Sequence, residues 1–482
     1  MEAAKALPNS QQKPQRKGLI LVAVSMFTLM ATLDGSIVNI AIPTISDQFG
    51  INMNQSEWIV SVYMMVICMF LLLFGKLGDT MGKVKIFKIG TIIFVLGSLL
   101  CGISTTLTTL LLSRVVQAVG ASMTMATNFG IITETYPPNE RGKALGILGS
   151  FVSLGSIAGP GLGGIIIAHF SWEYIFLINV PIGIIAIVMG ALILPKDEVF
   201  EEIKKVDYKG FSLVSVVILT LFGGIFIGQE AGYTKPYVLL LFALAVIGFL
   251  LLIRVENKIA HPLIDMTLFK NKAFSLALLC ALFVFSSNFF YNVLMPFYLQ
   301  KSLSLSASMA GLLLMVLPLT MVVLSPISGM ISDKIGPDRL TFIGLLCLTI
   351  AQLLYLFVDQ HSPIAFFVIL SMFIGAGNAF FQSPNNVLIM SSVPPKQLGV
   401  AGGLNALARN LGMVIGVALS TSVLYLAMSA KDGSRITTYI DSKPDLFIFG
   451  MHITFLVSSI LCIAGLIITG SRLFKKSHES SN

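Results

Sequence analysis

The sequence predicts an all-α integral membrane protein with fourteen transmembrane helices, arranged as two similar six-helix bundles plus two inserted helices. Composition is the first reason. Of the 482 residues, 55% are hydrophobic and only 11% are charged, whereas soluble globular chains carry about 25% charged residues. There is too little polar material to cover a water-soluble surface, so most of the chain must lie in lipid. The other two reasons are the spacing of the apolar runs and an internal repeat.

Fourteen apolar runs are each long enough to cross a bilayer as a helix. They cover 18–43, 57–77, 86–104, 107–135, 142–170, 173–195, 209–229, 235–255, 272–300, 308–332, 339–358, 364–392, 399–429 and 445–472. The chain then divides into a tail (1–17), a first bundle (18–195), a linker with two extra helices (196–271), a second bundle (272–472) and a tail (473–482).

The two bundles look like copies of one another. The motif GKLGDTMGK after the second run returns as GMISDKIGPDR after the tenth. Its glycine and aspartate positions match at one constant offset: Gly75, Asp79 and Gly82 with Gly329, Asp333 and Gly336. Repeats of this kind form secondary transporters, whose substrate site lies near the membrane midplane between the repeats.

The distribution of Lys and Arg predicts the orientation. With both termini in the cytoplasm, only five of the 31 basic residues fall in external loops: Lys235, Lys301, Lys431, Arg435 and Lys443. Because cytoplasmic loops carry the excess of basic residues, we expect both termini inside a plasma membrane. Since the basic residues occupy short loops between apolar runs, the net charge of +8 does not indicate nucleic-acid binding.

The first run contains one carboxylate, Asp34, which costs roughly 2.5–3.5 kcal/mol to insert when ionised. Arg114 in the fourth run is a permanent cation that needs acceptors. Counted from the outer helix ends, both lie roughly 10–14 Å deep at about 1.5 Å per residue. We expect them to face one cavity and to pair directly or through water. A carboxylate that can gain and lose such a partner suits proton coupling. A static structural pair, or Asp34 as counter-charge to a cationic substrate, remain alternatives.

The second bundle has no acid at the position that matches Asp34, where Asn288 lies. Neutral hydrogen-bonding residues dominate instead. The predicted substrate cavity contains Asn39, Gln117, Asn288, Tyr291, Asn292, Asn378, Gln382 and Arg409. Such amides among phenylalanines suit an uncharged or weakly charged aromatic ligand, although each also suits an interhelical hydrogen bond. The sequence leaves two alternatives for the partner of Arg409, which are an anionic group of the substrate or nearby carbonyl groups.

Several function classes are excluded. No GxxxxGK[ST] motif occurs, so this chain has no ATP-driven domain of its own. The five cysteines lie singly in apolar runs and the five histidines form no cluster, so we expect no disulfide framework, metal site or cofactor. The sequence suggests no catalytic arrangement of Ser, His and Asp, and we do not expect the protein to be an enzyme. Transport would then use an ion gradient or the gradient of the substrate.

Four stretches resemble the major facilitator superfamily, and within it the fourteen-helix drug:proton antiporters. They are LDGSIVNIAIP, GKLGDTMGK, RVVQAVGAS and GSIAGPGLGG. The resemblance covers essentially the whole chain and implies a major facilitator fold, alternating access and a monomer. It gives GKLGDTMGK the role of a cytoplasmic gate latch, although the family's usual Arg after the aspartate is replaced here by Thr80. The expected gate residues are Gly75, Asp79, Gly82, Lys83, Glu134, Arg141, Asp333, Gly336 and Arg339.

The fifth run carries Gly155, Gly159 and Gly163 at a spacing of four, with Pro160 between them. This spacing places the glycines on one helix face, where they allow close helix approach, and the proline removes a backbone donor. The resemblance implies an antiporter motif that seals the cavity against leak. A plain packing seam is the alternative.

The leading functional prediction is proton-coupled efflux of hydrophobic or cationic drugs, with Asp34 as the proton site and Arg114 as its modulator. The alternative is a dedicated carrier, such as an importer, of one metabolite or vitamin like riboflavin. The expected partners in both cases are the lipid bilayer, a small-molecule substrate and protons.

Overall fold

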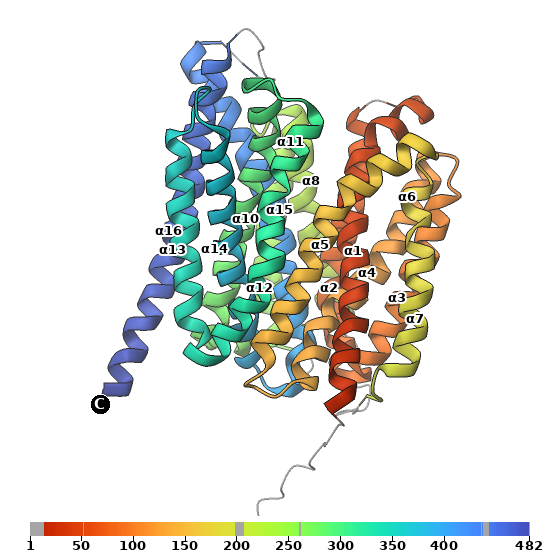
Figure 1. The fold of residues 1–482 in the computed structure, drawn as a ribbon. Helices are drawn as coiled ribbons and strands as arrows, with labels where there is room; N and C mark the ends of the chain where they lie inside the picture. Colours follow the sequence, from red (N-terminus) through yellow and green to blue (C-terminus); the bar gives the residue numbers. More distant parts are fainter. Residues whose placement is uncertain are drawn as a thin grey trace, which may run out of the picture.

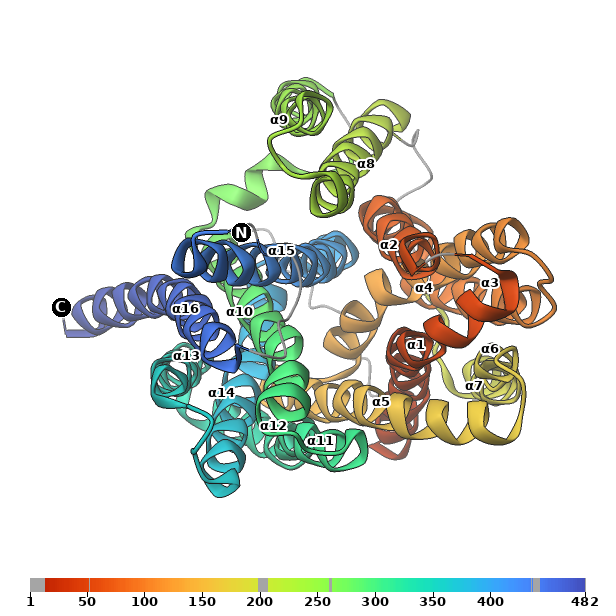
Figure 2. The same cartoon turned by 90° about the horizontal axis from the view of Figure 1, so that it is seen from above.

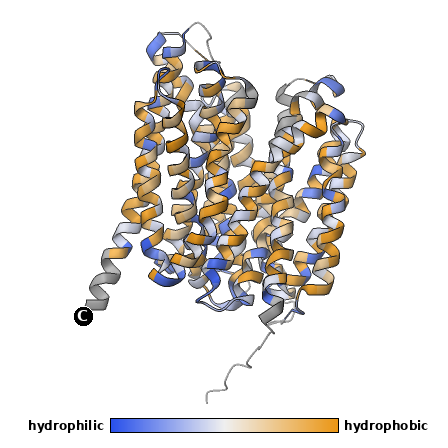
Figure 3. Ribbon diagram, viewed as in Figure 1, coloured by the Kyte–Doolittle hydropathy of each residue, from blue (hydrophilic) through white to orange (hydrophobic). Residues whose placement is uncertain are grey.

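A computed structural model describes residues 14–51, 53–197, 207–259, 262–434, 436 and 443–481. All regular elements in these ranges are helices (Figure 1). Fourteen helical segments are long and apolar enough to cross a membrane, which confirms the predicted number. Hydrophobic residues follow the middle of the helices and hydrophilic residues gather toward the ends (Figure 3).

The first bundle contains six crossings. They are α1 (Pro14–Phe49), α2 (Met53–Met81), α3 (Lys83–Gly102), α4 (Leu107–Thr135), α5 (Arg141–His169), and a divided sixth crossing of α6 (Tyr174–Leu177) and α7 (Asn179–Ile193). The inserted pair follows as α8 (Tyr208–Ala231) and α9 (Pro236–Glu256), and a 3-10 turn, η1 (Met266–Lys270), leads into the second bundle.

The second bundle repeats this plan. It contains α10 (Lys272–Phe297) with the π turn η2 (Tyr298–Ser302), then α11 (Ala307–Leu314) and α12 (Val316–Ile335), α13 (Pro337–Leu354) with η3 (Tyr355–Phe357), α14 (Ile364–Ser391), η4 (Pro395–Gln397), α15 (Leu398–Asp432) and α16 (Pro444–Ser481). Most ends agree with the apolar runs within a few residues. The two terminal helices are longer than predicted, because α1 begins inside the predicted tail 1–17 and α16 runs through the predicted tail 473–482.

The two bundles meet along two seams. Helix α5 packs on α12, and α2 packs on α15. Helices α8 and α9 lie outside both bundles, where α8 contacts α2 and α15 (Figure 2). The inserted pair therefore covers one of the two seams without interrupting either bundle.

Local polar signals start several helices at the predicted boundaries. The Thr106 side chain accepts the Thr109 N–H in a capping box at the start of α4. Asp207 accepts the Gly210 N–H at the start of α8, and Asn271 accepts two N–H groups at the start of α10. Each cap satisfies amide groups that a helix start would otherwise leave unpaired.

The three glycines of GKLGDTMGK could permit a tight turn, but most of the motif is helical. Helix α2 continues to Met81, and among the three glycines only Gly82 has a left-handed backbone, with φ of 104°. Gly75 serves close packing instead, because a Cβ there would lie 2.5 Å from the carbonyl oxygen of Gly399 in the other bundle. The second copy behaves alike, with Gly336 as the turn at φ of 89°.

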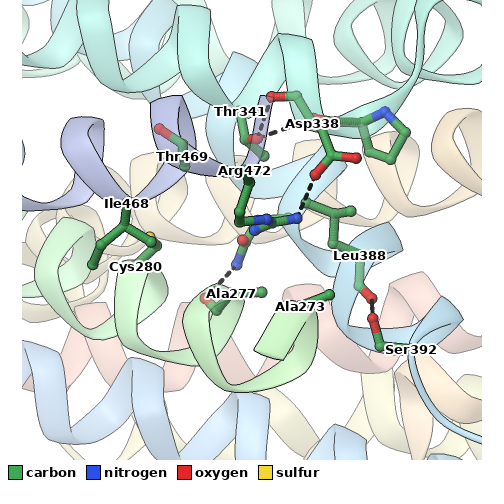
Figure 4. A network of polar contacts seen from close by, with 12 residues as sticks. Ala273, Ala277, Cys280, Asp338, Thr341, Leu388, Ser392, Ile468, Thr469 and Arg472 are labelled. Carbon is green, nitrogen blue, oxygen red and sulfur yellow. Dashed lines mark hydrogen bonds and ion pairs between the residues drawn. The ribbon is translucent and has the colours of Figure 1, made fainter. Parts of the chain in front are cut away.

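The start of α1 and the end of α16 lie on the same side of the molecule (Figure 1). The turns at Gly82 and Gly336 lie there as well, and we call this the latch side. Figure 4 shows how α16 is held at this side, where Arg472 forms an ion pair with Asp338 in the first turn of α13. The acid in the first turn of α13 also complements the dipole of that helix.

Candidate functional site

A cavity of about 2410 Å³ lies between the two bundles. Its walls come from α1, α2, α4 and α5 on one side and from α10, α12, α14 and α15 on the other, while α8 adds Ile225 and Phe226. The lining reaches Trp58 and Gln300 at the side away from the latch, and Phe129 and Ser325 toward the latch. Ligand pockets usually measure about 300–1,000 Å³, so the cavity accommodates a small molecule together with water.

Two aspartates close the latch side. Asp79 accepts the backbone N–H groups of Gly399 and Val400 at 2.7 and 2.9 Å, at the start of α15. Asp333 accepts those of Gly142 and Lys143 at 2.9 and 3.0 Å, at the start of α5. Each carboxylate thus caps a helix of the opposite bundle, where the N–H groups and the helix dipole favour a negative charge. The two repeats therefore use the same device to hold the bundles together.

Lys83 forms ion pairs with Asp79 and with Glu134. Its Nζ atom lies 3.0 Å from Asp79 Oδ1 and 2.8 Å from Glu134 Oε1, and its side chain is 3% exposed. The Thr80 hydroxyl, at the position after Asp79, donates to the Lys76 carbonyl at 3.2 Å.

The two arginines predicted for the gate, Arg141 and Arg339, differ in their contacts. Arg141 Nε donates to the carbonyls of Thr133 and Tyr136, both at 3.1 Å, and so ties the end of α4 to the start of α5. Arg339 is exposed, and its neighbour Asp338 makes the ion pair with Arg472 instead.

Asp34 and Arg114 form a direct ion pair inside the first bundle. Arg114 Nη1 donates to Asp34 Oδ2 at 2.7 Å, and both side chains are almost fully buried. The other carboxylate oxygen accepts the amides of Gln117 and Asn179, both at 2.8 Å. Arg114 also donates to the Ile59 carbonyl at 3.2 Å. The pair is therefore well satisfied, as a buried charge pair must be to persist.

The ion pair does not lie on the cavity wall, contrary to our expectation. Asp34, Arg114 and Gln117 are outside the lining, whereas Tyr63 belongs to it. The Tyr63 ring lies against the guanidinium, 3.9 Å from Arg114 Cζ to the ring centroid. Residues 114 and 117 share one face of α4, which is turned toward α1 and α3, so Gln117 moves from the predicted cavity to the ion-pair cluster. Tyr63 separates that cluster from the cavity.

The predicted amides of the second bundle do line the cavity. Asn288 and Asn378 exchange side-chain hydrogen bonds at 2.6 and 2.8 Å, and Gln382 donates to Asn378 at 3.4 Å. Asn292 lines the same wall and donates to the Asn288 carbonyl at 3.1 Å, while Tyr291 bonds Ser371 at 2.9 Å. The bonds of Asn288 and Tyr291 link α10 to α14, whereas Asn292 and Gln382 bond within their own helices on the cavity wall.

Arg409 is the only charged residue among the described residues that line the cavity. Asp34, the acid expected to face the same cavity, is already bound to Arg114. The Asn39 side chain lies outside the described part of the chain, so its predicted place in the cavity stays a prediction.

The glycines of α5 pack against α1. A Cβ at Gly155 would lie 2.7 Å from the Leu29 carbonyl oxygen, and one at Gly159 would lie 3.0 Å from the Ile37 nitrogen. Gly163 is buried, and the Pro160 side chain lies outside the described part. The seam fixes the helix that carries Asp34, which is compatible with both readings of the motif.

Sequence reasoning missed three residues of these sites. Asn179 and Tyr63 contact the ion pair, and Asp197 accepts the Val84 and Lys85 N–H groups, both at 2.8 Å, at the start of α3. Asn179 had a usable signal, because it is the one amide side chain in the apolar run 173–195. A tyrosine in a helix gives no comparable signal.

A large cavity between two similar helical bundles, with a few polar groups on a mostly apolar wall, is typical of a secondary transporter of the membrane. The model of the Major Facilitator Superfamily matches residues 24–417 and 277–482, and the chain belongs to this family of multi-pass membrane transporters.

Two relatives and one solved structure illustrate the range within the family. The chain is 37% identical to the riboflavin transporter RibZ of Clostridioides difficile, over 94% of this chain and 97% of that protein. It is 30% identical to the multidrug export protein EmrB of Escherichia coli, over 86% and 82%. The crystal structure of the human organic anion transporter MFSD10 superposes with a TM-score of 0.67 at 14% identity, over 94% and 99%, and so shares the fold.

Proposed function

We propose that this protein carries a flat, hydrogen-bonding heteroaromatic molecule across the cell membrane, with riboflavin as the leading candidate. The observation that supports this most is the lining of the cavity. Asn288, Asn292, Asn378 and Gln382 offer paired donors and acceptors there, and the described lining contains no carboxylate. Amides of this kind match the alternating donors and acceptors of a heteroaromatic ring, whereas a cationic drug would lack a counter-charge. The similarity to RibZ points in the same direction.

Efflux of hydrophobic or cationic drugs is the second candidate. The relatives named as multidrug exporters favour it, and so does the width of the cavity, which exceeds the needs of a single vitamin. In that case the counter-charge for a cation would come from Asp34 after a rearrangement of Tyr63 and Arg114.

Proton movement at Asp34 would drive either reaction. We place the latch side in the cytoplasm because the basic loops lie there, so both termini are cytoplasmic and the cavity of this structure opens outward. The protein would work as a monomer in the lipid bilayer, with its substrate and protons as its partners. Gaining a proton at Asp34 would release Arg114, which is the step that links the carboxylate to a change in packing.

Transport in cells separates the two candidates. Cells that cannot synthesise riboflavin are grown at limiting external riboflavin, with and without expression of this chain, and the same cells are tested for survival in several lipophilic cations. Rescue of growth without added resistance is expected. Broad resistance without rescue would reject the riboflavin proposal in favour of drug efflux.

A further inference from the structure

Two neighbouring residues of α15 line the cavity with donors that lack acceptors among the described residues, and the first is Arg409. Its partly buried side chain lines the cavity, and its titratable neighbour is the uncharged Cys68 thiol of α2. No carboxylate or carbonyl group bonds its guanidinium anywhere in the described part of the chain. Arg114 shows the contrast, since it has Asp34, Gln117 and the Ile59 carbonyl as acceptors. A guanidinium removed from bulk water needs acceptors, so Arg409 is poised to take them from a ligand.

The second donor is the amide group of Asn410. This residue lines the same cavity and is 4% exposed. Its Nδ2 atom has no hydrogen-bond acceptor within the described ranges. Buried donors are nearly always paired, so a turn of the Asn410 side chain toward the cavity would give this donor the acceptor that the protein does not supply.

The chemistry of both groups defines the ligand. We propose that Arg409 and Asn410 form a subsite for a planar pair of acceptor atoms, such as the adjacent carbonyl oxygen and unprotonated ring nitrogen of a flavin-type ring or the carboxylate of a flat organic anion. The rigid fork of the guanidinium matches two acceptors in one plane, and it is strongest when those acceptors carry negative charge. This subsite rests on the proposed function and names the part of the substrate that is recognised.

The subsite also predicts discrimination by charge. With no carboxylate in the described lining, nothing there offsets Arg409 when a cation enters. A flat anion should therefore bind more tightly than a flat cation of the same shape.

Binding to the purified full-length protein in detergent tests this proposal. The ligands are riboflavin, followed by quenching of its fluorescence, and the dyes fluorescein and rhodamine 6G, followed by anisotropy, because these dyes share a xanthene core and differ in charge. The variants are Arg409→Gln, which removes the charge, and Arg409→Lys, which keeps the charge but loses the fork. Lys431→Gln is the matched control, since it removes one positive charge from α15 outside the cavity lining.

The wild type should bind fluorescein at least about tenfold more tightly than rhodamine 6G, and Arg409→Gln should abolish this preference. Arg409→Gln should also weaken the affinity for riboflavin about tenfold. Arg409→Lys should keep the preference for fluorescein yet weaken the binding of riboflavin, because a point charge cannot hold two coplanar acceptors. Lys431→Gln should match the wild type, and thermal melting of every variant shows that it is folded.

The outcomes separate this inference from the proposed function. Riboflavin binding and dye preference that are unchanged in Arg409→Gln would overturn the subsite and leave the riboflavin proposal standing. A wild type that ignores riboflavin but shows an Arg409-dependent preference for fluorescein would reject riboflavin and support the subsite, now for an organic anion. A wild type that prefers rhodamine 6G would overturn the subsite.

Discussion

Asp79 in the first bundle accepts the backbone N–H of Gly399 in the second at 2.7 Å, and Gly75 lies directly against the same glycine. Asp333 and Gly142 repeat this arrangement at the other seam at 2.9 Å. A side chain between the helices would hold the backbones apart, so the glycines are what allow each carboxylate to reach a helix start across the bundle interface. The closed latch is thus built from two short, equivalent contacts.

Asp79→Asn should weaken the closed latch. The amide offers one acceptor oxygen where the carboxylate offers two, and it cannot pair with Lys83. Loss of a helix cap costs about 1 kcal/mol, which corresponds to a shift of roughly fivefold toward the state open at the latch side. A cysteine introduced at Ala126, in a background without the native cysteines, should react faster with a maleimide in the variant. Equal rates in both proteins would contradict a latch role for Asp79.

Lys83→Met should destabilise the protein more than Glu134→Gln does. Lys83 and Asp79 are 3% and 4% exposed, whereas the Glu134 side chain is 38% exposed. Breaking a buried pair costs about 3–5 kcal/mol, because one charge is left behind, while a partly exposed pair is worth about 0–1 kcal/mol. Thermal melting in detergent measures the stability of both variants. A larger loss in Glu134→Gln would show that the ion pair with Asp79 is not the stabilising contact.

The helices were predictable because each is an apolar run of bilayer length, and several of them start at a cap or end at a glycine. Thr106 and Asn271, for example, both cap a helix at a predicted boundary. The extensions of α1 and α16 were not predictable from apolar runs, since polar residues also form helix where the chain leaves lipid. The contact of Gly75 with Gly399 was not predictable either. Local sequence reports that a glycine is present but not whether a turn or a neighbouring helix requires it.

The ion pair was predictable from the number of charges, since Asp34 is the one acid in its run and a buried Arg114 must find an acceptor. The surroundings of the ion pair were not predictable. Whether a residue of α4 faces the cavity or the bundle core depends on the rotation of the helix, and Gln117 was assigned to the wrong side for that reason. Arg409 lines the cavity, and no carboxylate of the described lining pairs with it.

Arg114→Gln should lower the stability by about 3–5 kcal/mol, because it leaves the Asp34 carboxylate buried without its cation. The double variant Asp34→Asn with Arg114→Gln should recover most of this loss, since two neutral amides need less compensation than one charge. Neither variant should show pH-driven substrate accumulation in proteoliposomes. Accumulation by the stable double variant would reject Asp34 as the proton site, and melting curves of both proteins supply the control for folding.

Tyr63→Phe and Tyr63→Ala should differ in their effect on proton movement. The Tyr63 hydroxyl has no hydrogen-bond partner in the described part of the chain, so phenylalanine keeps the ring against Arg114 at little cost. Alanine removes the ring that separates the ion pair from the cavity, which should let water reach Asp34 without substrate. In proteoliposomes that contain a pH-sensitive dye, Tyr63→Ala should leak protons without substrate, while Tyr63→Phe should behave as the wild type. Equal leak rates in all three proteins would mean that Tyr63 does not separate the carboxylate from the cavity during transport.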